Sequence, residues 1–238
     1  MPTDTALVLL ILFGSSFVRS LVGFGDALLA MPLLLLVVGL DVAVPLVGLV
    51  AVVVAVILLS LNWREVEFRS LGPLLATALL GAPIGVLLVK SLEGEWLIHA
   101  LGVLLILFGG YRLIGPRLPE VRHPALTLPL GLLSGIFGGA YNVSGPFALL
   151  YAGLRGWSPR VFRASLQGFF IVTSAAIAVS QGVAGFWTPQ VWNLFLLSLP
   201  LVVTANLGGH LLASRVPSTW LERLISTGIA LIGVALVA

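Results

Sequence analysis

The sequence contains no cysteine and very little charge. With no thiol among its 238 residues, the chain forms no disulfide bond and uses neither thiol catalysis nor a cysteine-bound metal. Charged residues make up 9% of the chain, against about 25% in ordinary soluble domains. HExxH, GxSxG and P-loop motifs are absent, as is a carboxylate pair of the kind that an intramembrane enzyme would need. We therefore expect no enzyme, no metal site and no cofactor, and the fold is not an ordinary soluble domain.

Hydrophobic residues, by contrast, make up 59% of the chain, and they form eight long runs. A transmembrane helix needs about 20 apolar residues, so six of the runs predict one crossing each. The other two runs predict pairs of half-helices, because the first is too long for one helix and the second is interrupted at Gly138-Gly139 and Gly145-Pro146. The expected single helices are 42–61, 71–89, 96–114, 161–184, 189–213 and 219–238, and the expected hairpins are 5–38 and 125–152.

Short motifs recur in the same order in the two halves of the chain. Ala82-x-x-Gly85 returns as Ala205-x-x-Gly208, and Trp96-Leu97 returns as Trp220-Leu221. Chance alignment of two Leu/Gly-rich stretches is the alternative, but the shared order favours an internal repeat. We predict a first repeat over 1–114, a cytoplasmic linker over 115–124 and a second repeat over 125–238.

The positions of lysine and arginine decide the expected topology. Of the 12 lysine and arginine residues, 11 lie in loops, and Arg19 lies within the first run. If all eight runs cross the membrane, these 11 residues divide almost evenly between the two sides. If 125–152 is a re-entrant hairpin, all of them except Lys90 fall on one side, which the positive-inside rule makes cytoplasmic. Repeat symmetry then makes 5–38 a hairpin too, although charge does not show whether it returns to the outside. The predicted fold is an all-α membrane bundle of two inverted repeats, each a broken hairpin plus three helices. With so few charges, the net charge of +3 reflects arginines in short loops and not a nucleic-acid surface.

Two glycine-rich breaks are the strongest candidates for a binding site. One lies in Leu21–Pro32 and the other in Ser134–Pro146, and matched breaks in two repeats are typical of a transporter's substrate site. Half-helices that begin near Asp26 and Ser144 would direct unpaired N–H groups and a partial positive charge into one cavity. Such a cavity suits an anion. Ser20, Tyr141 and Asn142 are candidate donors, along with the Ser144 hydroxyl, whereas close helix packing is the alternative role for the glycines.

Arg19 and Asp26 are the ionisable residues deep in the first hairpin. Charges at such depth are costly and indicate function by default. The alternatives are a structural ion pair for Arg19 and a helix N-cap for Asp26. If an anion binds nearby, repulsion favours the protonated carboxyl group, so we expect these two residues to couple transport to protons. In the sixth run, Arg163 is a candidate guide for anions and Gln167, four residues on, a candidate donor on the same helix face.

The ordered motifs resemble the sulfite exporter TauE/SafE family of membrane transporters over essentially the whole chain. The motifs are Gly23-Phe-Gly25 with Pro32, Gly135-x-x-Gly138-Gly139 with Gly145-Pro146, Gly156-Trp-Ser-Pro-x-x-x-Arg163, and Leu207-Gly-Gly followed by Trp220-Leu-x-Arg-Leu. Asp26 departs from the small or apolar residue expected there. The resemblance implies transport of sulfite, organosulfonates or related sulfur-containing anions.

The sequence therefore predicts a multi-pass secondary transporter of the cytoplasmic (inner) membrane. Its expected partners are a small anion, the lipid bilayer and protons as a candidate coupling ion. Another small organic or inorganic anion is an alternative cargo, and a membrane accessory or assembly protein that transports nothing is an alternative function. The predicted substrate-binding residues are Ser20, Gly23, Phe24, Gly25, Gly138, Gly139, Tyr141, Asn142, Ser144, Gly145, Arg163 and Gln167, with Asp26 and Arg19 as ion-coupling residues.

Overall fold

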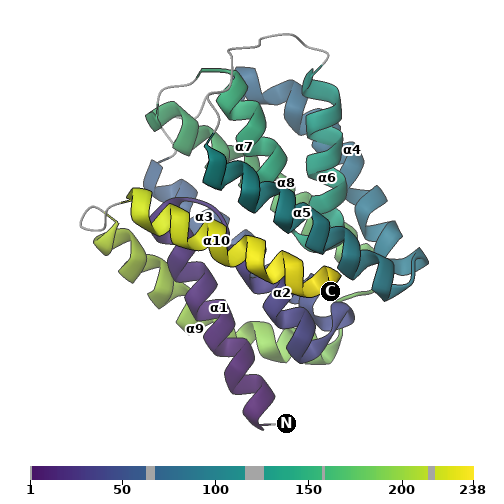
Figure 1. The fold of residues 1–238 in the computed structure, drawn as a ribbon. Coiled ribbons are helices and arrows are strands. Elements are labelled where there is room, and N and C mark those ends of the chain that lie inside the picture. The colour runs from purple at the N-terminus through teal and green to yellow at the C-terminus, as the bar shows by residue number, and fades with distance from the viewer. Residues whose placement is uncertain (1, 63–67, 116–125, 157–158, 214–217) are drawn as a thin grey trace.

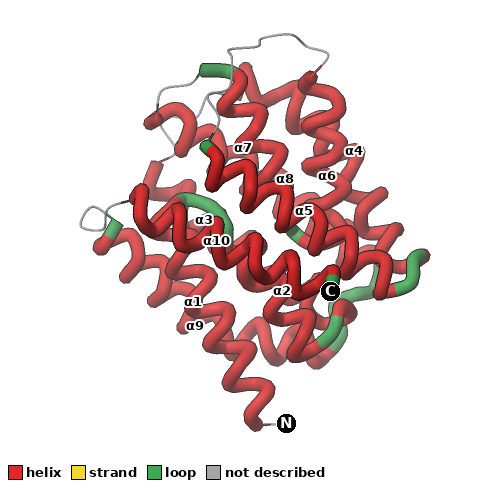
Figure 2. The backbone as a smooth tube through the Cα atoms, in the orientation of Figure 1, coloured by secondary structure: helices red, strands yellow, loops and turns green. Residues whose placement is uncertain are grey.

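The computed structural model describes residues 2–62, 68–115, 126–156, 159–213 and 218–238. Every regular element in these ranges is an α-helix, and the helices pack into one bundle (Figures 1 and 2). The first half contains α1 (Pro2–Val22), α2 (Asp26–Val38), α3 (Leu40–Asn62), α4 (Phe68–Ser91) and α5 (Gly94–Ile114). The second half contains α6 (Thr127–Tyr141), α7 (Gly145–Leu154), α8 (Pro159–Val183), α9 (Pro189–Leu212) and α10 (Ser218–Val237). The all-α prediction is confirmed.

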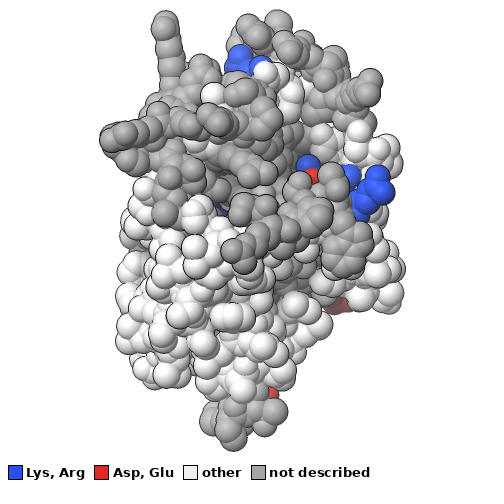
Figure 3. Space-filling view, turned by 90° about the vertical axis from the view of Figure 1, so that its left-hand side faces the viewer, with Lys and Arg blue, Asp and Glu red and all other residues white. Residues whose placement is uncertain are grey.

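Six helices within the described ranges are long and apolar enough to cross a membrane: α1, α3, α4, α5, α8 and α9. Large apolar side chains cover the outside of the bundle, as shown by Leu10, Leu80 and Leu211, which are 66%, 69% and 73% exposed. A water-soluble protein rarely exposes so much contiguous apolar surface. On the face shown in Figure 3, most of the described residues are uncharged, and basic side chains lie toward its upper and right-hand edges. These features confirm a multi-pass membrane bundle.

Both runs predicted to be broken contain a break, but its form differs from the expectation in two respects. The first run divides at Gly23–Gly25, where Gly23 and Gly25 have φ of 95° and 101°, a conformation that glycine adopts without steric cost. The helix before this break is not a half-helix: α1 has 21 residues and only α2, with 13, is short. The prediction of two half-helices is therefore wrong for α1, because its apolar stretch by itself has the length of a membrane span.

The second run divides at Asn142–Ser144, where Asn142 has φ 59°, and not at Gly138-Gly139. Helix α6 continues through both glycines to Tyr141. A Cβ at Gly139 would collide with the backbone carbonyl of Ala82, so this glycine allows α6 to approach α4 closely. The expected interruption at Gly138-Gly139 is wrong because these glycines serve helix packing.

Four helix pairs between the two halves form most of the bundle: α4 with α6, α1 with α9, α3 with α8, and α5 with α10. The α4 and α6 helices run parallel, since Gly81 lies against Leu132 and Gly85 lies one turn further along against Ile136. The α5 and α10 helices run antiparallel, because Gly102 packs near Leu236 whereas Gly109, further along, packs near Ser226. Small residues at these contacts let backbones touch, which is how membrane helices associate without a hydrophobic driving force.

The start of α1 and the end of α2 lie at the same end of the bundle. Asp4, Val38 and Gln190 line one cavity there. Gln190 follows the turn that contains Phe186, over whose ring the Lys90 ammonium lies at 5.9 Å. Near Lys90, Gly94 begins α5, where a Cβ would contact Leu40 at 3.4 Å. The first hairpin therefore returns to the end from which it starts, and this end also carries Lys90.

Candidate anion site between two helix N-termini

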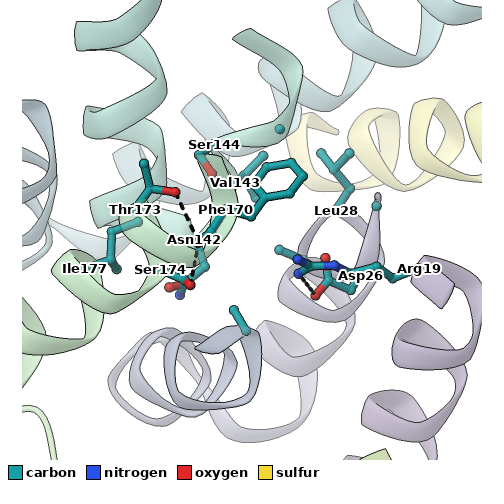
Figure 4. A pocket seen from close by; sticks show the side chains of 14 residues that line it. Arg19, Asp26, Leu28, Asn142, Val143, Ser144, Phe170, Thr173, Ser174 and Ile177 are labelled. Atoms are coloured by element: carbon teal, nitrogen blue, oxygen red, sulfur yellow. Dashed lines mark hydrogen bonds and ion pairs between the residues drawn. The ribbon is translucent and has the colours of Figure 1, made fainter. Parts of the chain in front are cut away.

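A small cavity separates the beginnings of α2 and α7 (Figure 4). It measures about 30 Å³, which is the share of about one water molecule. Five elements provide its walls: the end of α1, the start of α2, the middle of α3, the second break with the start of α7, and the middle of α8. The lining residues are Arg19, Gly25, Asp26, Ala27, Leu28, Ala51, Asn142, Val143, Ser144, Gly145, Phe170, Thr173, Ser174 and Ile177.

The two short helices begin at this cavity without a side chain that caps them. The N-cap of α2 is Gly25, and the N-cap of α7 is Ser144, whose hydroxyl makes no capping hydrogen bond. The first N–H groups of a helix have no partner within the helix. Asp26 is the first residue of α2, so the alternative that it is the N-cap is wrong. The cavity thus lies at two positive helix ends, in agreement with the predicted starts near Asp26 and Ser144.

Arg19 and Asp26 form a buried ion pair beside the cavity. The Arg19 Nη1 donates to Asp26 Oδ2 at 2.7 Å, and the two side chains are 4% and 13% exposed. The second terminal nitrogen of Arg19 lies 3.5 Å from the Gln167 amide oxygen, and its guanidinium carbon lies 5.1 Å from the centre of the Phe170 ring. The break at Gly23–Gly25 brings the two charged groups together, as the sequence allowed.

Helix α8 connects the two breaks through two glutamines. Gln167 Nε2 donates to the carbonyl oxygen of Gly23 at 2.9 Å, and Gln181 Nε2 donates to Asn142 Oδ1 at 3.4 Å. Asn142 in turn donates from Nδ2 to the Val44 carbonyl oxygen at 2.7 Å. These bonds hold irregular backbone within the bundle, where no bulk water is present to satisfy it.

The same helix supplies two hydroxyl groups to the cavity that the sequence analysis missed. Thr173 donates to the Phe169 carbonyl oxygen at 2.9 Å, and Ser174 donates to that of Phe170 at 2.6 Å. In Figure 4 both side chains lie near Asn142. For Ser174 a signal existed in the sequence: Gln167, Ser174 and Gln181 are spaced two turns apart, which places them on one face of the helix.

Several predicted site residues have partners elsewhere and do not line the cavity. The hydroxyl groups of Ser20 and Tyr141 donate to the carbonyl oxygens of Asn206 and Leu97, at 2.6 and 2.8 Å. Phe24 packs edge-on against Phe108, with the Arg112 guanidinium carbon 5.1 Å from its ring centre.

The remaining predicted residues divide between the cavity wall and the surrounding backbone. Gly25, Asn142, Ser144 and Gly145 line the cavity together with Arg19 and Asp26. Gly23 offers its carbonyl oxygen to Gln167. Gly138 and Gly139 lie within α6, where a Cβ would meet Ile177 and Ala82 respectively. The Arg163 side chain lies outside the described residues. Nowhere in the described ranges do three or more His, Asp or Glu side chains gather as metal ligands would.

Comparison with known proteins places the chain in a family. The model of the family described as "Sulfite exporter TauE/SafE" matches residues 7–236. The chain is 28% identical over 184 residues to a "Probable inner membrane transporter protein TsaS" of Comamonas testosteroni, and this match covers 72% of the chain and 75% of that protein. No solved structure matches the chain. Because the family model spans nearly every residue, including both breaks, the chain belongs to the sulfite exporter TauE/SafE family.

Proposed function

We propose that this protein is a secondary transporter that moves small sulfur-containing anions, such as sulfite or an organosulfonate, across the cytoplasmic membrane. Members of the family are membrane transporters and not enzymes, and the similar protein from Comamonas is named a probable inner membrane transporter. The observation that carries the proposal is the convergence of two helix N-termini and Arg19 on one buried cavity. Sulfite and sulfonate oxygens are hydrogen-bond acceptors, and this cavity offers donors and positive charge.

The anion would take the place that the Asp26 carboxylate now holds beside Arg19. Among the described residues that line the cavity, Arg19 is the cation and Asp26 the anion. A second anion beside this pair would be repelled by Asp26. Protonation of Asp26 removes the repulsion and releases the guanidinium group, so binding of the anion and uptake of a proton would occur together. Separation of Asp26 from Arg19 would also enlarge the cavity, which measures about 30 Å³ with the pair formed.

Helix packing supports the inverted repeat and the topology. In such a repeat α1 corresponds to α6, α3 to α8, α4 to α9 and α5 to α10. The contact between α1 and α9 should then have a counterpart between α6 and α4. The two helices of each of these pairs pack against each other extensively. A twofold axis in the membrane plane requires corresponding helices to run antiparallel, as α5 and α10 do. The end with Lys90 and both termini of the first hairpin would face outward.

A thermal stabilisation screen of the purified protein tests the proposed function. A ligand that binds only the folded state raises stability, by about 2.7 kcal/mol at 100 times its Kd. We expect sulfite, thiosulfate, taurine or sulfoacetate to raise the melting temperature, and Arg19→Gln to abolish the rise. Stabilisation by carboxylates alone would change the cargo to another organic anion. No shift with any anion would refute the proposal and favour an accessory protein.

A further inference from the structure

A buried amide group beside the second break has an oxygen without a partner. Gln181 is completely buried, and its Oε1 is one of five buried side-chain atoms in the described part of the chain that make no hydrogen bond. The other end of the amide, Nε2, lies 3.4 Å from Asn142 Oδ1, which is longer than the usual range for such a bond. An unpaired amide oxygen is costly in a membrane interior, so it indicates a ligand that binds here.

The side-chain oxygens of Asn142 and Gln181 meet at one point beside Gly48 of α3. A Cβ at Gly48 would collide with Gln181 Oε1 and would lie 3.0 Å from Asn142 Oδ1. Because Gly48 has no side chain, both oxygens have access to this point. Asn142 Nδ2 donates to the carbonyl oxygen of Val44, one turn before Gly48, at 2.7 Å. This bond fixes the orientation of the Asn142 amide and leaves its oxygen for another partner.

The cavity has an acceptor end, formed by Asn142, Thr173 and Ser174. In Figure 4 these side chains lie together and apart from the pair of Arg19 and Asp26. The hydroxyl groups of Thr173 and Ser174 donate their protons to carbonyl oxygens of α8, so their oxygens can only accept further bonds. The acceptor end therefore suits a cation or a donor, whereas the end with Arg19 suits an anion.

The end of α6 adds partial negative charge at the acceptor end. Helix α6 ends at Tyr141, and Asn142 is its C-cap. The last carbonyl groups of a helix have no partner within it and form the negative end of its dipole. Those of Phe137 and Gly138 accept from backbone N–H groups of the break. Helix ends and unwound backbone of this kind coordinate sodium ions in transporters built from inverted repeats.

We propose that a sodium ion binds between Asn142 Oδ1 and Gln181 Oε1 at the acceptor end of the cavity, and that it raises the affinity for the transported anion. The hydroxyl oxygens of Thr173 and Ser174 lie on the cavity side of this site. With the buried ion pair formed, the cavity of about 30 Å³ has room for about one water-sized ligand, which fits a sodium ion. The effect on the anion rests on the proposed function, whereas the sodium site does not.

A cation at the acceptor end and an anion at the Arg19 end would stabilise each other. Both ligands border one small buried cavity, where opposite charges attract strongly because the local dielectric constant is low. The positive ends of α2 and α7 also face this cavity, so sodium alone binds more weakly than sodium together with the anion. Thermodynamic linkage requires that each ligand raise the affinity of the other by the same factor.

Comparison of two salts tests the sodium ion. The Kd of a simple alkyl sulfonate would be measured by calorimetry in sodium chloride and in N-methyl-D-glucamine chloride at equal ionic strength. We expect a Kd at least about tenfold lower in sodium chloride. Without the sulfonate, sodium chloride should still raise the melting temperature by at least about 2 °C. Equal Kd values and equal melting temperatures would overturn the site and leave a water molecule between the two amides.

Two variants test where the sodium ion binds. Gln181→Met keeps the length of the side chain and removes its oxygen, and Gly48→Ala places a methyl group where that oxygen lies. In both, the ratio of the Kd values in the two salts should fall to about one. Ser180→Ala is the matched control next to Gln181 on α8, because its hydroxyl group donates to the Ala176 carbonyl oxygen at 2.8 Å. It should keep the wild-type ratio, and a wild-type ratio in Gln181→Met would overturn the site.

A smaller change covers the case in which these variants do not fold. Ser174→Ala removes one hydroxyl oxygen from the acceptor end and should reduce the sodium effect on Kd at least about threefold; an unchanged effect would overturn the acceptor end as the place of the ion. If the wild type binds no anion in either salt, the proposed function has failed. The rise in melting temperature with sodium, and its loss in Gln181→Met or Ser174→Ala, then still decides the sodium site.

Discussion

Replacement of Asp26 by asparagine tests the link between the buried ion pair and transport. Arg19 and Asp26 are almost completely buried and 2.7 Å apart. Loss of one partner of a buried pair leaves the other charge uncompensated, which costs roughly 3–5 kcal/mol. Asparagine still offers an oxygen to Arg19, so we expect the lower end of that range without ligand. An anion bound beside Arg19 would restore the missing charge, and anion-dependent stabilisation should therefore be larger in Asp26→Asn than in the wild type.

The same variant should separate anion affinity from pH. If binding requires protonated Asp26, the wild-type Kd rises with pH, by up to tenfold per pH unit, which is about 1.4 kcal/mol. Asparagine carries no titrating proton, so the Kd of the variant should change little with pH. Because Asp26→Asn removes the proton-binding group, the variant should bind the anion but fail to accumulate it against the anion's concentration gradient.

The assay is isothermal titration calorimetry from acidic to neutral pH. The ligand is a simple alkyl sulfonate, because a sulfonate keeps a single negative charge over this range, whereas sulfite takes up a proton and becomes bisulfite. Arg19→Gln is the control that removes the cation and should bind weakly at every pH. Parallel curves of affinity against pH for the wild type and Asp26→Asn would refute the reasoning. In that case the pair would be structural, and the coupling ion would act elsewhere.

Three further predictions concern topology, the glycines and the first break. A cysteine at Gly94 should react with an impermeant thiol reagent added to intact cells, and one at Ser218 should not; equal labelling would contradict the two-sided arrangement. A Cβ at Gly145 would have only one atom within 4 Å, an aromatic carbon of Phe170 at 3.9 Å. Gly145→Leu should therefore fill the cavity and abolish anion-dependent stabilisation, while the protein still inserts into the membrane. Gly139→Leu should instead separate α6 from α4 and reduce the yield of folded protein. Gln167→Leu should leave the carbonyl oxygen at the first break unpaired and lower stability by about 1–3 kcal/mol, measured by thermal unfolding; an unchanged melting temperature would show that Gln167 does not hold the break.

Sequence alone determined the class of protein and the two apolar runs in which a helix breaks. Membrane insertion depends on the apolar content of each run, a local property, and the motif order identified the family before any comparison. The starts of the short helices were predicted near Asp26 and Ser144 and lie at Asp26 and Gly145. Helix starts of this kind are predictable because glycine and asparagine adopt the left-handed conformation locally.

Only the tertiary structure decided which polar groups face the cavity. Ser20 and Tyr141 bond to carbonyl oxygens 186 and 44 residues away, and Gly139 packs against a different helix. Thr173 and Ser174 enter the cavity because α8 passes between the two breaks. Within a bilayer every polar group must find a partner inside the protein, and that partner is set by which helices are neighbours. Local sequence therefore showed which residues are polar at depth, and the packing of helices distant in the chain decided what each one bonds to.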